Sequence, residues 1–296
     1  MQWDKLRVFH AVAEAGSFTR AGEALRLSQS AVSRQISALE ASLGVTLFHR
    51  HARGLKLTEH GELLYRTARE VFAKVGMTEA MLAEGKDRPK GPLIVTATLG
   101  FSTSWLAPRI AKFVDLYPEI SLTLTADDRE LDLGMREADV AIRMRAPTQP
   151  DLIQRHLMTV HIHAYASKGY LKEWGVPNTL DDLDHHRLIA YSEGPLTKIT
   201  DPNWLLRSSS GDSALRRPAF RVNNVLAMQR AVESGLGIAA LPDYIVEEHT
   251  VAVRVLSEMG GPSVETYFVY PEELRASKRI TVFRDFLFEQ LRDTRF

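Results

Sequence analysis

The chain has 296 residues, 45% hydrophobic and 25% charged, as expected for a soluble globular protein of two or three domains. Lys plus Arg and Asp plus Glu balance at 37 each, there is no cysteine, and no apolar run is long enough to span a membrane. This composition excludes disulfides, thiolate chemistry and thiolate metal sites. The start, with Asp4 and no apolar stretch, does not resemble a secretory signal, so we expect a cytoplasmic location.

The balanced net charge hides an asymmetry along the chain. Residues 1–58 carry eight basic and four acidic side chains, whereas the remainder carries 29 and 33. This favours a polyanionic partner for the N-terminal part. A chance fluctuation in a short segment is the alternative explanation.

Three short helices are predicted at the N-terminus, over 3–15, 18–25 and 28–43. Ser17 and Ser28 are good N-caps, and Gly16 and Gly44 suit helix ends. The third helix is expected to bury Val32, Ile36, Leu39 and Leu43. Short helices joined by a tight second turn indicate a helix-turn-helix. Away from the buried stripe the third helix carries Gln29, Ser30, Ser33, Arg34 and Ser37.

A wing and a long helix are predicted next. Two β-like runs, 45–48 and 55–58, flank a turn with Arg50 and Arg53, and Thr58 caps a helix to about residue 84. A heptad-like seam along this helix favours pairing with another chain, and packing against its own domain is the alternative. The seam comprises Leu64, Ala68, Val71, Val75, Thr78 and Leu82.

Residues 85–92 are Gly-, Pro- and charge-rich and predict a linker, after which strands and helices alternate. This pattern indicates an α/β domain with a largely parallel sheet, in two lobes. Strands are predicted at 93–97, 121–126, 139–144, 162–166, 188–191, 220–222, 238–241, 253–256 and 266–270. Helices are predicted at 105–117, 131–136, 225–234 and 278–291.

The stretch FHAVAEAGSFTRAGEALRLSQSAVSRQISALEASLGVTLFHR, followed by RGLKLTEHG, resembles the LysR-type transcriptional regulators. WLAPRIAKFVDLYPEISL, ADVAIR and VNNVLAMQRAVESGLGIAALP extend the resemblance over the rest of the chain. One departure is Ser30, where the family usually has proline. Within the family, residues 1–10 and DLIQRHLMTVHIHAYAS resemble the alphaproteobacterial LsrB/VtlR-like branch. Some relatives sense oxidants through cysteine, which this chain cannot do.

The resemblance implies an all-α head with a winged helix-turn-helix over 1–58 and a linker and dimerisation helix over 59–90. It further implies a two-lobed α/β effector domain of periplasmic-binding-protein type over 91–296. Lobe I would comprise 91–162 and 267–296, and lobe II 163–266. The implied function is sequence-specific promoter binding, modulated by a small effector between the lobes. The implied partners are double-stranded DNA, a second copy in a homodimer or homotetramer, and RNA polymerase as a further candidate.

In this reading the third helix enters the major groove. Gln29 suits adenine, Ser30, Ser33 and Ser37 suit bases or phosphates, and Arg34 suits a guanine edge or a phosphate. The remaining candidate contacts are Ser17, Thr19 and Arg20 with phosphates, and Arg50 and Arg53 in the wing, of which Arg53 suits the minor groove.

An effector site is predicted where strands end between the lobes. Five small or hydroxyl residues after the strand at 93–97 suggest an anion site at a helix N-terminus. The alternative is plain capping by Ser102 or Ser104, but a cap needs only one hydroxyl. Arg145 could clamp a carboxylate, whereas Arg143 belongs to the ADVAIR motif and can be structural. The predicted effector residues are Thr98, Gly100, Ser102, Thr103, Ser104, Arg145, Tyr191, Asn223, Leu241 and Pro242.

The sequence also bears on two other function classes. A cytoplasmic solute-binding module, with a head that only dimerises, is disfavoured by the polar face of the third helix. An enzyme is disfavoured because GxSxG, GxGxxG and GxxxxGK[ST] are absent from the sequence. We expect no cofactor and no metal, because His161, His163, His185 and His186 lack partners at zinc-ligand spacing. The segment 195–217 is equally a lid or a surface insertion.

Overall fold

The computed structural model describes residues 2–51, 54–83, 88–147, 149, 151–192, 201–207, 215–246 and 251–292. The chain divides into two compact units, one of Met1–Ala83 with Gly134–Arg136 and one of Glu84–Leu133 with Glu137–Phe296. We call residues 2–83 the head and residues 88–292 the body. None of the helices in the described ranges is long and apolar enough to cross a membrane.

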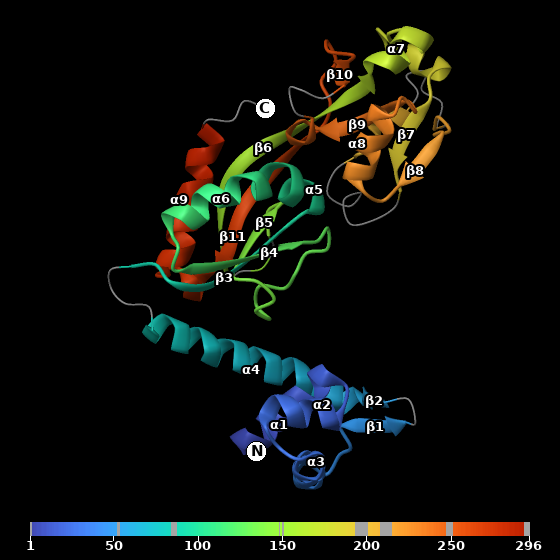
Figure 1. Ribbon diagram of the computed structural model, residues 1–296. Helices are drawn as coiled ribbons and strands as arrows, with labels where there is room; N and C mark the ends of the chain where they lie inside the picture. The colour runs from blue at the N-terminus through green and yellow to red at the C-terminus, as the bar shows by residue number, and fades with distance from the viewer. Residues whose placement is uncertain are drawn as a thin grey trace. The chain divides into compact units, whose positions relative to one another are not determined.

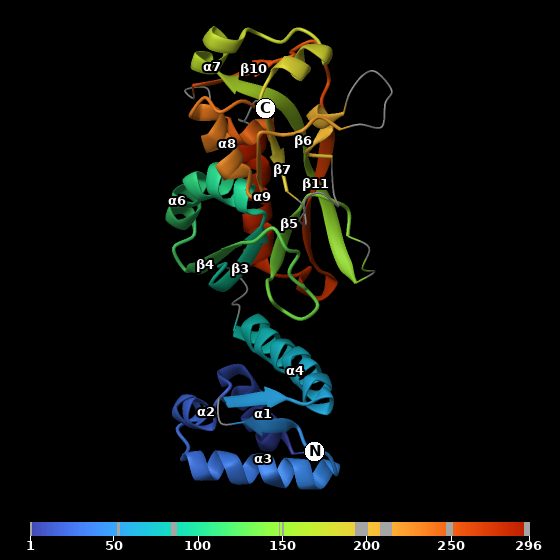
Figure 2. The ribbon, with the colours of Figure 1, turned by 90° about the vertical axis from the view of Figure 1, so that its right-hand side faces the viewer.

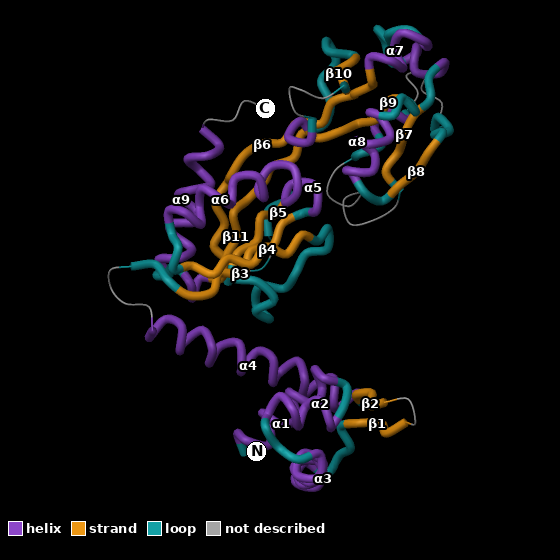
Figure 3. Tube along the Cα trace, viewed as in Figure 1, coloured by secondary structure: helices purple, strands orange, loops and turns teal. Residues whose placement is uncertain are grey.

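The head is a helix-turn-helix with a two-stranded wing (Figures 1 and 3). The three predicted helices form within one or two residues of their expected bounds. The wing strands pair antiparallel from Phe48–Leu57 to His51–Gly54, so the first begins three residues later than predicted. The head elements are α1 (Trp3–Ala15), α2 (Phe18–Leu25), α3 (Gln29–Leu43), β1 (Phe48–His51), β2 (Gly54–Leu57) and α4 (Glu59–Ala83).

The body is built on one nine-stranded sheet in the order β4-β3-β5-β11-β6-β9-β7-β8, with β10 paired to β6. Its strands are β3 (Gly91–Ala97), β4 (Ile120–Ala126), β5 (Val140–Arg143), β6 (Leu152–Ser167), β7 (Leu188–Tyr191), β8 (Phe220–Val222), β9 (Ile238–Pro242), β10 (Ala252–Val255) and β11 (Ser263–Pro271). Its helices include α5 (Leu99–Phe101), which continues through a π-helical turn at Ser102–Leu106 into α6 (Ala107–Leu116), and α7 (Lys168–Trp174), α8 (Val225–Glu233) and α9 (Lys278–Arg292).

Strand β6 joins the two lobes of the body. Its first part, up to His161, pairs antiparallel with β11, and its last residues pair with β9 and β10 (Figure 2). We call the β3–β4–β5–β11 side lobe I and the β7–β8–β9–β10 side lobe II. The sheet is parallel only on its flanks, between β3 and both neighbours and between β7 and both neighbours. The prediction of a largely parallel sheet is therefore wrong at its centre.

Two further predictions on the body need correction. Residues 131–136 form a turn instead of a helix, because Asp132 and Glu137 exchange two hydrogen bonds across it and Arg136 has a φ of 60°. The strand predicted at 162–166 begins ten residues earlier. Its pairing with β11 shifts register at Thr266/Tyr267, and such an irregularity breaks the apolar alternation that reveals a strand.

Helix α4 begins beneath the wing at a place that only glycine fits. A Cβ on Gly61 would lie 2.1 Å from the carbonyl oxygen of Leu47, a backbone atom that cannot rotate away. Thr58 caps the helix as predicted, accepting from the Gly61 N–H at 3.0 Å and donating to the Thr46 carbonyl at 2.8 Å.

We predict that Gly61→Ala destabilises the head by about 1–3 kcal/mol, because the added methyl group must push the wing from α4. Gly76→Ala is the matched control, since a Cβ there meets nothing within 4 Å. Because alanine is favoured over glycine inside a helix, Gly76→Ala should raise the free energy of unfolding by about 0.5–1 kcal/mol. Urea unfolding of the full chain tests both. Equal effects of the two variants would contradict the close packing.

Candidate functional site

The face of α3 that was predicted to be polar is exposed in the head. Ser28 caps the helix by accepting from the Ala31 N–H at 3.2 Å. Val32, Ile36 and Leu39 are fully buried, whereas Leu43 is 41% exposed and was wrongly assigned to the buried stripe, because the helix ends there above the core. The exposed set is Gln29, Ser30, Arg34 and Ser37, and Ser33 is half-buried.

The start of α2 lies in the same subdomain, joined to α3 by a tight turn. The Leu27 N–H donates to the Gly22 carbonyl at 2.8 Å, and a Cβ on Gly22 would lie 2.7 Å from the Leu27 oxygen. Thr19 and Arg20 are exposed. Ser17 occupies the N-cap position without a side-chain capping bond. The two helices therefore present hydroxyl, amide and guanidinium groups together.

The wing is tied to α3 through a carboxylate. Glu40 Oε1 accepts from the N–H groups of Leu47 at 2.7 Å and Phe48 at 3.3 Å. Of the two wing arginines, Arg50 lies in β1 with a side chain outside the description, and Arg53 lies outside the described residues. Their predicted contacts stay predictions.

The first half of α4 packs on its own head, which was the alternative to a pairing seam. Ala68 is fully buried in the head core, and Leu64, Tyr65 and Phe72 pack against that core. The Phe72 ring lies 4.7 Å from that of Trp3. Ala68 thus has no surface left for a partner and is corrected to a core residue. Of the other predicted seam residues, Val71 is half-buried, Val75 is 38% exposed, and the side chain of Leu82 is outside the description.

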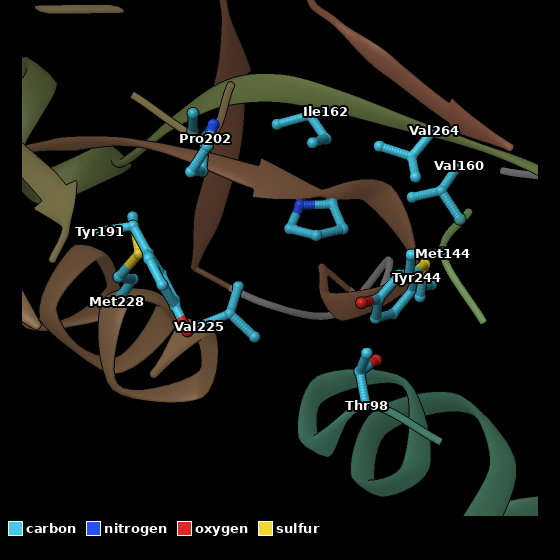
Figure 4. Close-up of a pocket in the computed structure, with 12 residues that line it drawn as sticks. Thr98, Met144, Val160, Ile162, Tyr191, Pro202, Val225, Met228, Tyr244 and Val264 are labelled. Atoms are coloured by element: carbon cyan, nitrogen blue, oxygen red, sulfur yellow. The ribbon is translucent and has the colours of Figure 1, made fainter. Parts of the chain in front are cut away.

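A cavity of about 50 Å³ lies between the two lobes of the body (Figure 4). Its wall is almost entirely apolar, and its polar groups are one threonine and two tyrosines. None of the lining residues is charged. The lining residues are Thr98, Met144, Val160, Ile162, Tyr191, Pro202, Val225, Met228, Ala240, Pro242, Tyr244 and Val264.

One wall of this pocket depends on a glycine. Helix α5 begins at Leu99 and brings Gly100 directly against lobe II. A Cβ on Gly100 would lie 2.6 Å from Val225 Cγ1, 3.2 Å from Ile245 Cδ1 and 3.4 Å from the Tyr244 hydroxyl. The backbone of α5 therefore contacts side chains of lobe II directly, because Gly100 has no side chain of its own. The ring of Phe101 adds an edge-on contact with Tyr244, at 5.4 Å between centroids.

The tyrosines of the pocket are held in apolar surroundings. Tyr191 donates its hydroxyl to the Asn223 carbonyl at 2.9 Å. Burial, with a smaller contribution from the charge of Asp128, raises the pKa of Tyr191 to about 12. Burial and the same carboxylate raise the pKa of Tyr244 as well. Both phenols are therefore neutral hydroxyls at pH 7.

The helix N-terminus at which an anion site is predicted, over residues 98–104, is partly occupied from within the chain. The helix starts at Leu99, and its first N–H donates at 3.0 Å to Asp128 Oδ1, a carboxylate of the chain itself. Thr103 is exposed and Ser104 half-buried, both beyond the first turn, and Ser102 is buried. Arg145 binds Glu130 through two hydrogen bonds of 2.7 and 2.8 Å and does not line the pocket, which corrects its assignment as a clamp.

Of the other predicted effector residues, some line or shape the pocket and others do not. Thr98, Tyr191 and Pro242 line the pocket, and Gly100 shapes it. Leu241 points into the core of lobe II, since neighbours on β9 face opposite ways, and is corrected accordingly. Asn223 is exposed and contributes its backbone carbonyl to Tyr191.

Sequence reasoning missed most of the apolar wall. Val160 lies before the strand predicted at 162–166, and Ile162 and Ala240 lie within predicted strands but were not assigned to the site. Ala240 could have been found from Pro242, because residues two apart in a strand lie on the same face. Val225 and Met228 share a face of α8, but this face looked like ordinary core. Tyr244 follows directly after β9, the position where a ligand contact is expected.

Comparison with known proteins identifies the family. Residues 3–62 match the bacterial regulatory helix-turn-helix protein, lysR family, and residues 86–292 match the LysR substrate binding domain. Over 293 residues the chain is 31% identical to the HTH-type transcriptional regulator CrgA of Neisseria meningitidis serogroup B, covering 97% of this chain and 96% of the relative. This chain is a LysR-type transcriptional regulator.

Solved structures of such regulators share its fold. The structure of CrgA from Neisseria meningitidis matches with a TM-score of 0.62 and 30% identity over 98% of this chain and 99% of that chain. The Vibrio cholerae virulence activator AphB matches with a TM-score of 0.61 and 27% identity, again over 98% and 99%. The regulator therefore has a DNA-binding head and an effector-binding body, and its family consists of transcriptional regulators rather than enzymes.

We predict that Gly100→Ala and Val225→Ala are coupled in this regulator. Alone, Gly100→Ala strains the lobe contact at a cost of about 1–3 kcal/mol. Val225→Ala, which leaves a small void, costs about 1–2 kcal/mol. Together they should cost at least about 1 kcal/mol less than their sum, because the second change removes the methyl group that the first one meets. A double-mutant cycle by urea unfolding measures this, and additivity would contradict the contact.

Proposed function

We propose that this cytoplasmic regulator reads a duplex DNA site with α3 in the major groove, and that a small effector in the pocket of the body modulates the binding. One observation carries the DNA part of the proposal. Helix α3 exposes four polar side chains, Gln29, Ser30, Arg34 and Ser37, on the face opposite a fully buried stripe, and its cap and its contact with the wing fix it in the head. Rigid elements are what positions side chains against base edges.

The contacts divide into readout and positioning. Gln29 at the start of α3 makes an amide pair with adenine, and Ser30, Ser33 and Ser37 bind bases or phosphates. Arg34 binds a phosphate. At the start of α2, Ser17, Thr19 and Arg20 also bind phosphates, and Arg50 and Arg53 extend the surface into the wing, with Arg53 in the minor groove.

Two heads act together in this proposal. The second half of α4, with Val75 exposed, is the part of the predicted seam that remains free to pair, in a homodimer or homotetramer. Two heads would then occupy half-sites about 34 Å apart or further. RNA polymerase is the candidate partner through which promoter binding takes effect. The LsrB/VtlR-like assignment stays a prediction from residues 1–10 and 151–167.

The effector part of the proposal is supported by the pocket between the lobes. A concave, apolar cavity with a few converging hydroxyl groups is the usual form of a small-molecule site. It is lined from both lobes and from β6, which joins them. An occupant therefore contacts both lobes at once, and its binding favours one lobe arrangement over others. We propose that this difference reaches the heads through dimer geometry.

We predict that Arg34→Ala weakens DNA binding and flattens its salt dependence. Losing one phosphate contact lowers the magnitude of the slope of log K against log salt by about 0.9. The measurement uses a duplex selected by the wild-type protein from a random pool. Arg66→Ala on α4, which also removes one exposed positive charge, is the control and should keep the slope. A wild-type slope in Arg34→Ala would refute the phosphate assignment.

We further predict that Ala240→Leu fills the pocket and abolishes effector binding while DNA affinity in the absence of effector is kept. Three added carbon atoms take up most of a cavity of about 50 Å³. Ala107→Leu, an exposed position at the start of α6, is the matched control. Thermal-shift screening of small molecules measures the loss. A compound that stabilises wild type and Ala240→Leu equally would place the effector site elsewhere.

A further inference from the structure

The chemistry around the pocket indicates which class of effector it takes, an inference that rests on the proposed effector site. A second cavity of about 20 Å³ adjoins the pocket and shares Thr98 and Met144 with it. Asp127, Asp128 and Arg129 are among its lining residues. The apolar pocket therefore opens next to a cluster of charged groups, and the pairing within this cluster decides what it can bind.

Two ion pairs hold four of the charged side chains near this cavity. Asp127 binds Arg129 at 2.8 Å, and Glu130 binds Arg145 at 2.7 Å. Asp128 accepts one hydrogen bond, from the Leu99 N–H to Oδ1, and forms no ion pair within the described part of the chain. Burial of this half-buried carboxylate, and secondarily the charge of Asp127, raises the pKa of Asp128. A carboxylate in that situation gains by meeting a donor.

Asp128 lines the second cavity, in lobe I. Its charge acts on Tyr191 and Tyr244, both of which line the pocket from lobe II. It is thus an electrostatic neighbour of both polar groups of the opposite wall. Arg129 and Arg143 also line the second cavity, but neither is among the groups that shift the pKa of Tyr191 or Tyr244, and no residue lining the apolar pocket is positively charged.

We propose that the effector is a small molecule with an apolar body and a cationic amine head, the body in the pocket and the amine on Asp128. The apolar wall accounts for the body. A carboxylate head would instead lie beside the Asp128 charge, while Arg145 is paired with Glu130 and Arg143 donates to the Leu131 carbonyl at 3.0 Å. An ammonium group can donate to the second oxygen of Asp128, and the bond is charge-assisted.

The experiment uses three probes of one shape, isobutylamine, isobutanol and isobutyrate, with the full-length protein at pH 7. Molecules this small bind with dissociation constants on the order of 1 mM, so ligand-observed NMR titration is the suitable measurement. For wild type we expect isobutylamine to bind most tightly and isobutyrate least. Asp128→Asn should weaken isobutylamine about tenfold, as for a lost charge-assisted hydrogen bond, and change isobutanol by less than about twofold.

Two variants control for the charge and for the fold. Asp127→Asn removes the neighbouring carboxylate, which is paired with Arg129, and should leave the order of the probes unchanged. Asp128→Asn keeps an oxygen for the Leu99 N–H. Because the pKa of Asp128 is raised in the folded protein, its ionisation opposes folding at pH 7. The midpoint of thermal unfolding of Asp128→Asn should therefore equal or exceed that of wild type.

The outcomes separate this inference from the proposed effector site. If isobutyrate binds wild type more tightly than isobutylamine, if isobutylamine shows no saturable binding, or if Asp128→Asn keeps the preference for the amine, the amine assignment is wrong. If the probes bind Ala240→Leu as well as wild type, the effector site itself is wrong. Loss of all binding in Ala240→Leu, with loss of only the amine preference in Asp128→Asn, supports both.

Discussion

The pocket of this regulator depends on the direct contact of Gly100 with lobe II. Since no side chain separates α5 from Val225 and Ile245, the two lobes close upon a narrow apolar space. Any larger residue at position 100 would hold them apart. The contact also brings the start of α5 close to Tyr244, so the same backbone that closes the pocket supplies its polar corner. The same contact therefore shapes the pocket from both lobes.

Charge pairing explains why the pocket differs from the anion site that the hydroxyl-rich segment suggested. A helix N-terminus attracts a carboxylate, and in this chain Asp128 provides one from within the protein. Arg145 is likewise paired with Glu130. With the Leu99 N–H and Arg145 used internally, Asp128 remains beside the pocket as a carboxylate without an ion pair among the described residues. The preferred partner of such a carboxylate is a cation or another hydrogen-bond donor.

The sequence predicted the elements with one buried stripe far better than it predicted the site. The three head helices, the cap at Thr58 and α9 form within two residues of their expected bounds, because local periodicity and caps specify them. The first half of β6 was not predicted from the sequence, because its pairing with β11 is irregular. The roles of Arg145, Ala68 and Leu241 depended on Glu130, the head core and the phase of β9, which are tertiary contacts. Periodicity carries no information on such partners.

The central claim is that an occupant of the pocket strengthens the contact of α5 with lobe II. Hydrogen exchange of the full-length protein with and without saturating isobutylamine tests it most directly. The account predicts slower exchange of the amides at 99–106 and 225–233, with no change along α9 at 278–292. Unchanged exchange at 99–106 under saturation, or equal slowing along α9, would contradict it.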